Sequence, residues 1–173
     1  MDRNTELVGT ERQLLTQFLD SQRGGVLDVV AGLTSEQLHR RMVGSATTIG
    51  ALLKHLALVE DSWFQEVLMD RELPEPWMSA PLDDDPDWDF HSAAADQPGD
   101  LVALYSAACQ RSRLALQGCE SLDIMALAIK RDQAFSLRWI VIHLIEETAQ
   151  HLGHMDILRE LILDAQPATS GGA

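Results

Sequence analysis

SLRWIVIHLIEETAQHLGHMDILRELILD, residues 136–164, is the stretch that decides the fold of this chain. Its apolar residues recur at helical intervals, and Ser136 can cap the first turn, so we expect one long helix. His143, Glu147, His151 and His154 follow one another at spacings of four, four and three. These spacings place all four side chains within roughly a quarter of the helix circumference. The same sector carries Ile140, Leu144, Leu158 and Leu161, so we expect it to face a core.

Buried imidazoles and a buried carboxylate are costly unless a partner satisfies them. One interpretation is a divalent metal, since zinc, nickel, iron and manganese accept both imidazole nitrogen and carboxylate oxygen. The other is a metal-free hydrogen-bond network in which the imidazoles protonate and pair with the carboxylate. Glu147 and His151 can chelate one ion from a single helix, and a third ligand must come from elsewhere. His55 is the histidine outside this helix that lies on an inward stripe. His39 and His91 lie in connections and are expected at the surface, with an approach of His91 to the site from the loop as the alternative.

The composition excludes several classes of protein. The chain has 173 residues, of which 46% are hydrophobic, and a formal charge of −14. Such a charge disfavours binding to DNA or RNA. No apolar run is long enough to span a membrane, and the first residues lack the apolar core of a signal peptide, so a cytoplasmic protein is expected. Nucleotide-binding loops and a serine-nucleophile motif are missing, and Cys109 and Cys119 are expected to be ordinary thiols.

Helical periodicity recurs in three further segments, at residues 6–33, 47–69 and 100–117, with a short helical turn at 38–41. We therefore predict an all-α protein, an up-down-up-down four-helix bundle formed by a single domain over residues 1–167, with a disordered tail at 168–173. In the second helix the predicted inward stripe consists of Leu52, His55, Leu56, Val59 and Trp63. Lys54, Asp61 and Gln65 are predicted to lie on the opposite side.

Residues 70–99 break the helical pattern between the second and third helices. They contain five prolines, an acidic run at 83–87 and the tryptophans Trp77 and Trp88. We interpret this long loop as an ordered cover over one end of the bundle, and the acidic run as a solvated surface. On the last helix, a second apolar strip is formed by Ile142, Ile145, Ala149 and Leu152. One bundle core covers only one side of a helix, so this strip predicts a homodimer.

The chain resembles the DinB-like superfamily of four-helix metal proteins, which includes thiol-dependent S-transferases. The resemblance rests on SATTIGALLKHLALVEDSWF (45–64), PDWDFH (86–91) and SLRWIVIHLIEETAQHLGHMDILREL (136–161). It implies a divalent metal bound by one histidine of the second helix and a pair on the last. Because residues 151–154 match the family's H-R-G-Q, the implied ligands are His55, Glu147 and His151. Glu147 stands where many members of the family have histidine.

A His/Glu/His set resembles the branch related to mycothiol-dependent maleylpyruvate isomerase, in which the metal activates a thiol cofactor. That isomerase has a further C-terminal domain, and this chain ends soon after the fourth helix, so the resemblance implies the bundle and the metal site rather than the isomerase reaction. The leading hypothesis is a metal-dependent enzyme, a thiol S-transferase or a hydrolase, with zinc as the first choice of metal and a small-molecule substrate or thiol as its partner. His143 and His154 would then orient ligands or act as acid and base. The alternative hypothesis is a non-catalytic metal-binding stress-response protein.

Overall fold

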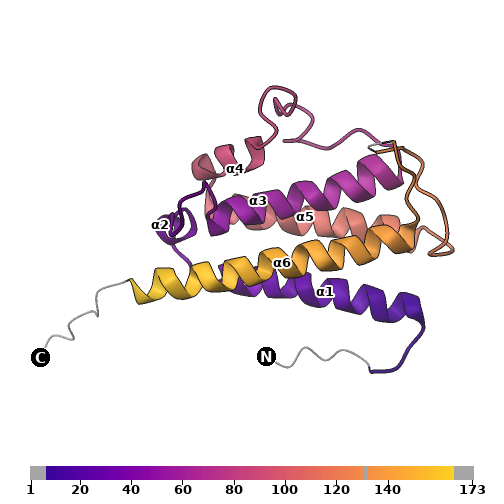
Figure 1. Cartoon of the computed structure of the whole chain (residues 1–173), viewed down its shortest axis with the longest axis horizontal. Coiled ribbons are helices and arrows are strands. Elements are labelled where there is room, and N and C mark those ends of the chain that lie inside the picture. Colours follow the sequence, from indigo (N-terminus) through magenta and orange to yellow (C-terminus); the bar gives the residue numbers. More distant parts are fainter. Residues whose placement is uncertain (1–6, 131, 166–173) are drawn as a thin grey trace, which may run out of the picture.

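Four long helices form a bundle in the computed structural model, which describes residues 7–130 and 132–165 (Figure 1). They are α1 (Glu11–Val30), α3 (Ile49–Asp61) with its π-helical continuation η1 (Ser62–Leu68), α5 (Pro98–Gln117) and α6 (Leu137–Asp164). Three short elements complete the described part: α2 (Ser35–Leu38), α4 (Trp88–Ser92) and the 3-10 turn η2 (Ala93–Ala95). The predicted all-α four-helix bundle is confirmed. The predicted tail at 168–173 lies outside the described residues.

The predicted alternation of helix directions is wrong. Lys54 near the start of α3 pairs with Asp96 just before α5, and Asp61 at the end of α3 pairs with Arg111 late in α5. These two helices therefore run in the same direction, and α1 and α6 are parallel to each other in the opposite direction (Figure 1). The order is up-down-down-up. The connection 69–97 makes this possible, because it is long enough to return along the bundle before α5 begins.

Hydroxyl side chains start three of the four long helices of the described chain. Thr10 caps α1 in a capping box with Gln13, Thr48 accepts from the backbone N–H of Ala51, and Ser136 accepts from that of Trp139. The hydroxyl at each start satisfies a backbone donor that has no partner within the helix. The cap thus defines the residue at which each helix begins. The starting residue and the helical period together decide which side of the bundle each later side chain faces.

The connection 69–97 lies along α3 rather than over an end of the bundle (Figure 1). Its Trp77 is 2% exposed, and the indole N–H donates to a carboxylate oxygen of Asp61 at 2.9 Å. The side of α3 opposite α6 is therefore covered, which corrects the predicted outer face: Lys54, Asp61 and Gln65 are all buried. The pattern was misleading because ion pairs and hydrogen bonds to the cover and to α5 replace water around Lys54 and Asp61.

A buried ion pair lies between α1 and α3. The guanidinium of Arg23 donates from Nε to Glu60 Oε1 at 2.7 Å and from Nη2 to Glu60 Oε2 at 2.6 Å. Both residues are 1% exposed. The Cys109 thiol of α5 lies beside this pair, and burial, followed by the nearby Glu60 carboxylate, raises its pKa to about 12. Among the described residues, no helix has the combined length and apolarity needed to cross a bilayer.

Candidate metal centre

His55 projects from the middle of α3 toward α6. Its neighbours Lys54 and Leu56 are buried on either side, whereas the His55 side chain is 23% exposed. Because Thr48 fixes the start of the helix, the imidazole emerges on the side that faces α6. On that side the two helices run antiparallel, so successive turns of α3 meet successive turns of α6 in reverse order.

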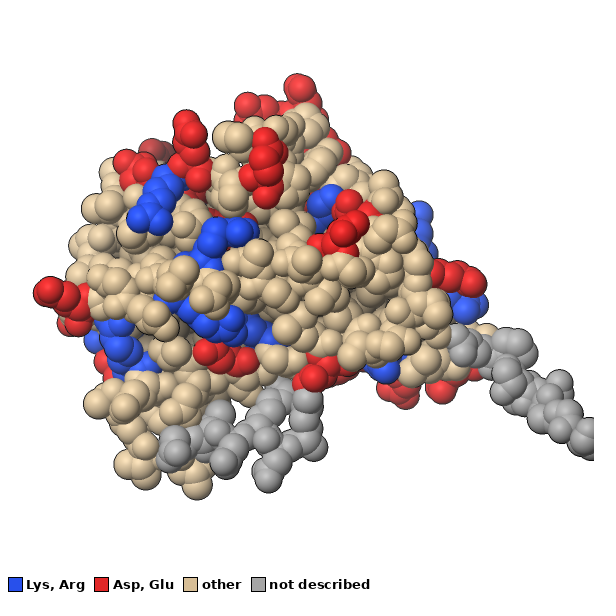
Figure 2. All heavy atoms as spheres, turned by 180° about the vertical axis from the view of Figure 1, so that it is seen from behind, with Lys and Arg blue, Asp and Glu red and all other residues tan. Residues whose placement is uncertain are grey.

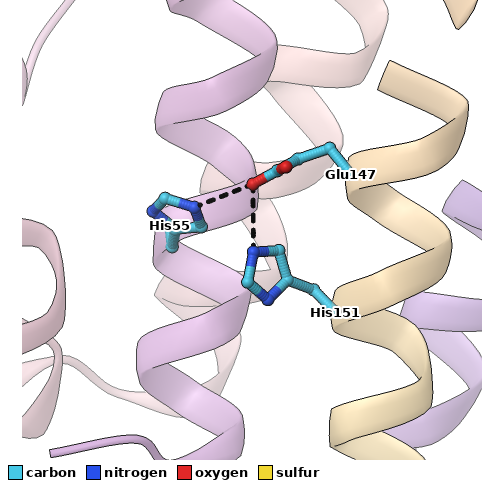
Figure 3. A group of neighbouring side chains, drawn as sticks. All are labelled: His55, Glu147 and His151. Atoms are coloured by element: carbon cyan, nitrogen blue, oxygen red, sulfur yellow. Dashed lines mark hydrogen bonds and ion pairs between the residues drawn. The ribbon is translucent and has the colours of Figure 1, made fainter. Parts of the chain in front are cut away.

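Glu147 and His151 project from α6 toward His55 (Figure 3). They are one helical turn apart, and His151 Nε2 lies 3.0 Å from Glu147 Oε1. His55 Nε2 lies 3.4 Å from the same oxygen. Each of the three residues offers one donor atom, and these atoms all lie within 4.8 Å of one another. The structure thus brings together the three residues that the sequence resemblance implies as ligands, and the binding of a metal by them stays a prediction.

Asp89, on α4, holds the other nitrogen of His55. Its carboxylate accepts from His55 Nδ1–H at 2.7 Å and is 2% exposed. Phe90 packs on the same imidazole, with ring centroids 5.0 Å apart. The hydrogen bond fixes the orientation of the ring and leaves Nε2 directed at Glu147. A carboxylate behind a histidine is the usual outer partner of a metal-binding imidazole, because it fixes the tautomer and makes the nitrogen more basic.

The three side chains are electrostatically coupled. Burial lowers the pKa of His55, but the hydrogen bonds to Asp89 and Glu147 outweigh it and raise this pKa to about 9. Hydrogen bonds from His151 and then from His55 hold the pKa of Glu147 well below its usual range. At neutral pH the metal-free centre therefore contains the ionised Glu147 and a protonated His55. The proton of His55 takes the place that a metal cation would take beside the carboxylate.

The donor set fits a divalent cation. Two ligand atoms at about 2.1 Å from a tetrahedral zinc ion are separated by about 3.4 Å. The two hydrogen-bonded separations at the site, 3.0 and 3.4 Å, are close to that value. His151 Nδ1 is buried with no hydrogen-bond partner among the described residues. Two imidazoles and one carboxylate also match the three-ligand pattern of catalytic zinc sites, which keep a further position open.

His143 does not reach this group. Its ring stacks on Trp139 at 4.9 Å and meets the edge of Trp63 at 4.8 Å, within an aromatic cluster at the start of α6. It is half-buried there. The expectation that it faces the centre fails because the two tryptophans fill the space between α3 and α6 at that level. The chemical or supporting role predicted for His143 stays untested, and its contacts are those of a packed aromatic side chain.

His154 lies beside the centre, on its outer side. Its ring is 5.7 Å from that of His151, and the residue is exposed, so the prediction that it faces the core is wrong. It lines a pocket of about 320 Å³ together with Val43, Ser45, Thr47, Ile157 and Leu158. The predicted sector of α6 is therefore only partly buried: Ile140, Leu144 and Leu158 face the core, whereas His154 and Leu161 are exposed.

The two other histidines lie away from the centre. His91 is exposed and pairs with Asp85, as predicted for a surface residue. His39 is half-buried instead, because its ring packs against Gly50, where an added Cβ would lie 2.8 Å from its Nδ1. The functional residue that sequence reasoning missed is Asp89, which lies just beyond the acidic run at 83–87 and was assigned no role. Its signal was the pair of flanking aromatic residues, Trp88 and Phe90, which is unusual for an exposed carboxylate.

Comparison with known proteins gives the family. The model of the mycothiol S-transferase family matches residues 14–164, which includes all three residues of the centre. This chain belongs to the mycothiol S-transferase family. It is a DinB-like family, in agreement with the resemblance seen in the sequence. A conserved protein from Enterococcus faecalis shares the fold, with a TM-score of 0.71 over 91% of this chain and 99% of that chain, at 13% identity. No curated protein matches this mycothiol S-transferase family member significantly.

Proposed function

We propose that this protein is a divalent-metal-dependent S-transferase that takes mycothiol as its thiol and a small electrophile as its second substrate. The observation that carries the proposal is the convergence of His55, Glu147 and His151 inside the span matched by the family model. The match itself indicates a thiol substrate. Zinc is the cation we propose, since two imidazoles and one carboxylate are among its catalytic ligand sets.

Each residue has a distinct part in this proposal. A divalent cation at this position lowers the pKa of a thiol or water bound to it and so supplies a nucleophile near neutral pH. Asp89 keeps His55 in the tautomer whose Nε2 is directed at the centre, and Glu147 supplies the negative charge. The aromatic cluster of Trp63, Trp139 and His143 lies one helical turn before Glu147, and in this proposal it shields one side of the centre. The other side stays accessible.

The pocket beside His154 supports a site for the electrophile. It is one ring away from His151, and Val43, Ile157 and Leu158 give it an apolar lining. Ser45 and Thr47 add hydroxyl groups at its rim. We therefore propose an acceptor with an apolar body, and we assign His154 as the residue between the acceptor and the centre, where an imidazole can donate or accept a proton.

Two other functions compete with this one. A hydrolase would use the same three residues with water in place of the thiol. A non-catalytic metal-binding stress-response protein would have a closed set of four ligands. Among the described residues the group contains three, and His154 stays outside it, which favours a catalytic centre. The His/Glu/His set also supports a relationship to the maleylpyruvate isomerase branch, which we propose for the ligand arrangement alone.

The proposal is tested with metal-free protein reloaded with zinc. We expect one equivalent of bound zinc, and conjugation of monobromobimane to mycothiol that depends on it, with glutathione as the comparison thiol. His55→Ala should lose both zinc and activity, whereas Asp85→Asn, remote from the centre, should lose neither. Zinc bound tightly without any thiol transfer would favour the non-catalytic alternative. A stoichiometry near zero with an intact fold would refute the metal centre itself.

A further inference from the structure

A second pocket lies between η1 and α5, on the side of the bundle away from α6. Its volume is about 290 Å³, and its lining includes Gln65, Met69, Arg71, Arg111, Leu114 and Ala115. None of these residues belongs to the metal centre or to the pocket beside His154. The size is at the lower end of about 300–1,000 Å³, the range typical of small-molecule sites. It suits a ligand of few atoms.

Gln65 lies at the wall of this pocket and carries an unsatisfied donor. The residue is 6% exposed, and its Nε2 is buried with no hydrogen-bond partner among the described residues. Gln65 lies on η1, and the backbone N–H of Arg71 donates to the main-chain carbonyl oxygen of Gln65 at 2.9 Å. π-Helical turns are rare and occur frequently at functional sites. Here the wide turns bring the carboxamide of Gln65 and the chain at Arg71 to the same pocket.

Two guanidinium groups stand at the pocket. Arg111 is fixed by the buried Asp61, to which its Nε and Nη2 donate at 2.8 Å each, so Nη1 is left for another acceptor. Arg71 makes no side-chain hydrogen bond or ion pair with any described residue, and it is exposed. Asp70 and Glu72 flank Arg71 in the sequence but do not line the pocket. The geometry thus presents one fixed cation and one free cation to the same space.

The surrounding surface is unusual for so acidic a protein. Acidic residues outnumber basic ones, 27 to 13. On the face seen from behind, Lys and Arg side chains nevertheless gather in a band, with acidic side chains mostly around its margins (Figure 2). Near the pocket, Arg12 donates to the backbone carbonyl oxygen of Leu116 on α5, and Arg113 of α5 donates to Asp20. Arg111 and Arg113 are each paired with an aspartate, so Arg71 is the cation that stands at the pocket without a carboxylate partner among the described residues.

We propose that this pocket binds a small organic carboxylate. The carboxylate would accept from Arg71, from the outer nitrogen of Arg111 and, with the carboxamide turned so that Nε2–H faces the pocket, from Gln65, a set of donors that matches its planar geometry. The apolar part of the ligand would lie on Met69, Leu114 and Ala115. The site is independent of the metal centre, so it holds whether or not the proposed transferase activity does.

Titration of the full chain with benzoate, followed by amide chemical shifts, tests this site directly. Benzoate carries one carboxylate on a small apolar body and fits the volume. We expect saturable binding with shifts concentrated at residues 65–71 and 111–118. Arg71→Gln should weaken binding by about tenfold or more, the effect of losing a charged hydrogen bond. Arg40→Gln removes the same charge at a position outside the pocket and is the matched control, with a change below about twofold.

The variant Gln65→Met distinguishes an effect on ligand binding from an effect on folding. Methionine has a similar volume and no donor, so the variant should unfold no more easily than the wild type without ligand, because a buried unsatisfied amide is removed. Its thermal stabilisation by benzoate should be lost. Equal weakening in Arg71→Gln and Arg40→Gln, shifts spread over the whole surface, or full stabilisation of Gln65→Met by benzoate would each overturn the proposal.

Discussion

Replacing Asp89 by asparagine tests whether α4 supports the metal centre. The carboxylate is 2% exposed and accepts from His55 Nδ1–H at 2.7 Å, and Phe90 packs on the same ring. Asparagine has nearly the same volume, so packing should persist. Its amide removes the negative charge that makes His55 more basic, and it can present a donor where an acceptor is needed. Loss of such a partner typically costs 10- to 100-fold in metal affinity, or about 1.4–2.7 kcal/mol.

The chain provides a matched control for this experiment. Asp85 accepts from His91 Nδ1 at 2.9 Å, so the same pair of groups occurs at a site where His91 is 55% exposed and no metal is expected. Competitive zinc titration of the two variants should show 10- to 100-fold weaker binding for Asp89→Asn and a change below about twofold for Asp85→Asn. Equal affinities of Asp89→Asn and wild type would refute the role of Asp89. Equal losses in both variants would point to a general charge effect.

Four further predictions concern the rest of the molecule. Glu147→Ala should abolish tight zinc binding, Glu147→His should retain it, and His154→Ala should weaken it only mildly. Equilibrium zinc titration measures the three affinities, and the reverse ranking would show that the ligands lie one turn further along the helix. Arg23→Met leaves Glu60 buried and unpaired and should lower the free energy of unfolding by about 3–5 kcal/mol in urea titrations, and a loss below about 1 kcal/mol would contradict the burial. At pH 8.5 roughly one Cys109 thiol in 3,000 is ionised, given a pKa of about 12, so mass spectrometry should find it unmodified by iodoacetamide until the protein unfolds. The homodimer predicted from the apolar strip of α6 should sediment at twice 19.2 kDa, and a single 19.2 kDa species at micromolar concentration would remove it.

The residues of the centre were accessible to sequence reasoning because helix geometry is regular. A spacing of four residues places Glu147 and His151 on one side whatever surrounds the helix. His55 followed from its place on an apolar stripe together with the family resemblance. By contrast, the depth of the site depends on which helices pack beside α6. The open position of His154 was therefore outside the reach of periodicity.

Other parts of the structure depend on contacts that no local pattern encodes. The direction of α5 is decided by where the connection 69–97 ends, and its prolines indicate only that it is not a helix. Asp61 is fully buried because Trp77 and Arg111 both reach it, from 16 and 50 positions further along the chain. Asp89 is set apart from the neighbouring acidic residues by its contact with His55 of α3, which is 34 positions away in the sequence. The role of a carboxylate depends on its partner, and the partner is determined by the tertiary structure.

The three residues of the centre differ widely in how far apart they are along the chain. Glu147 and His151 are four positions apart, whereas His55 and Glu147 are 92 apart. A nascent helical turn therefore brings the first two together before the bundle exists, but His55 joins them only when α3 and α6 have docked. An unfolded chain can therefore bind a cation weakly through Glu147 and His151 alone. Binding to the unfolded state reduces the stabilisation that the cation gives to the folded state. Coordination by His55, in contrast, would close a loop between residues 92 positions apart. Closing a long loop restricts an unfolded chain more than closing a short one.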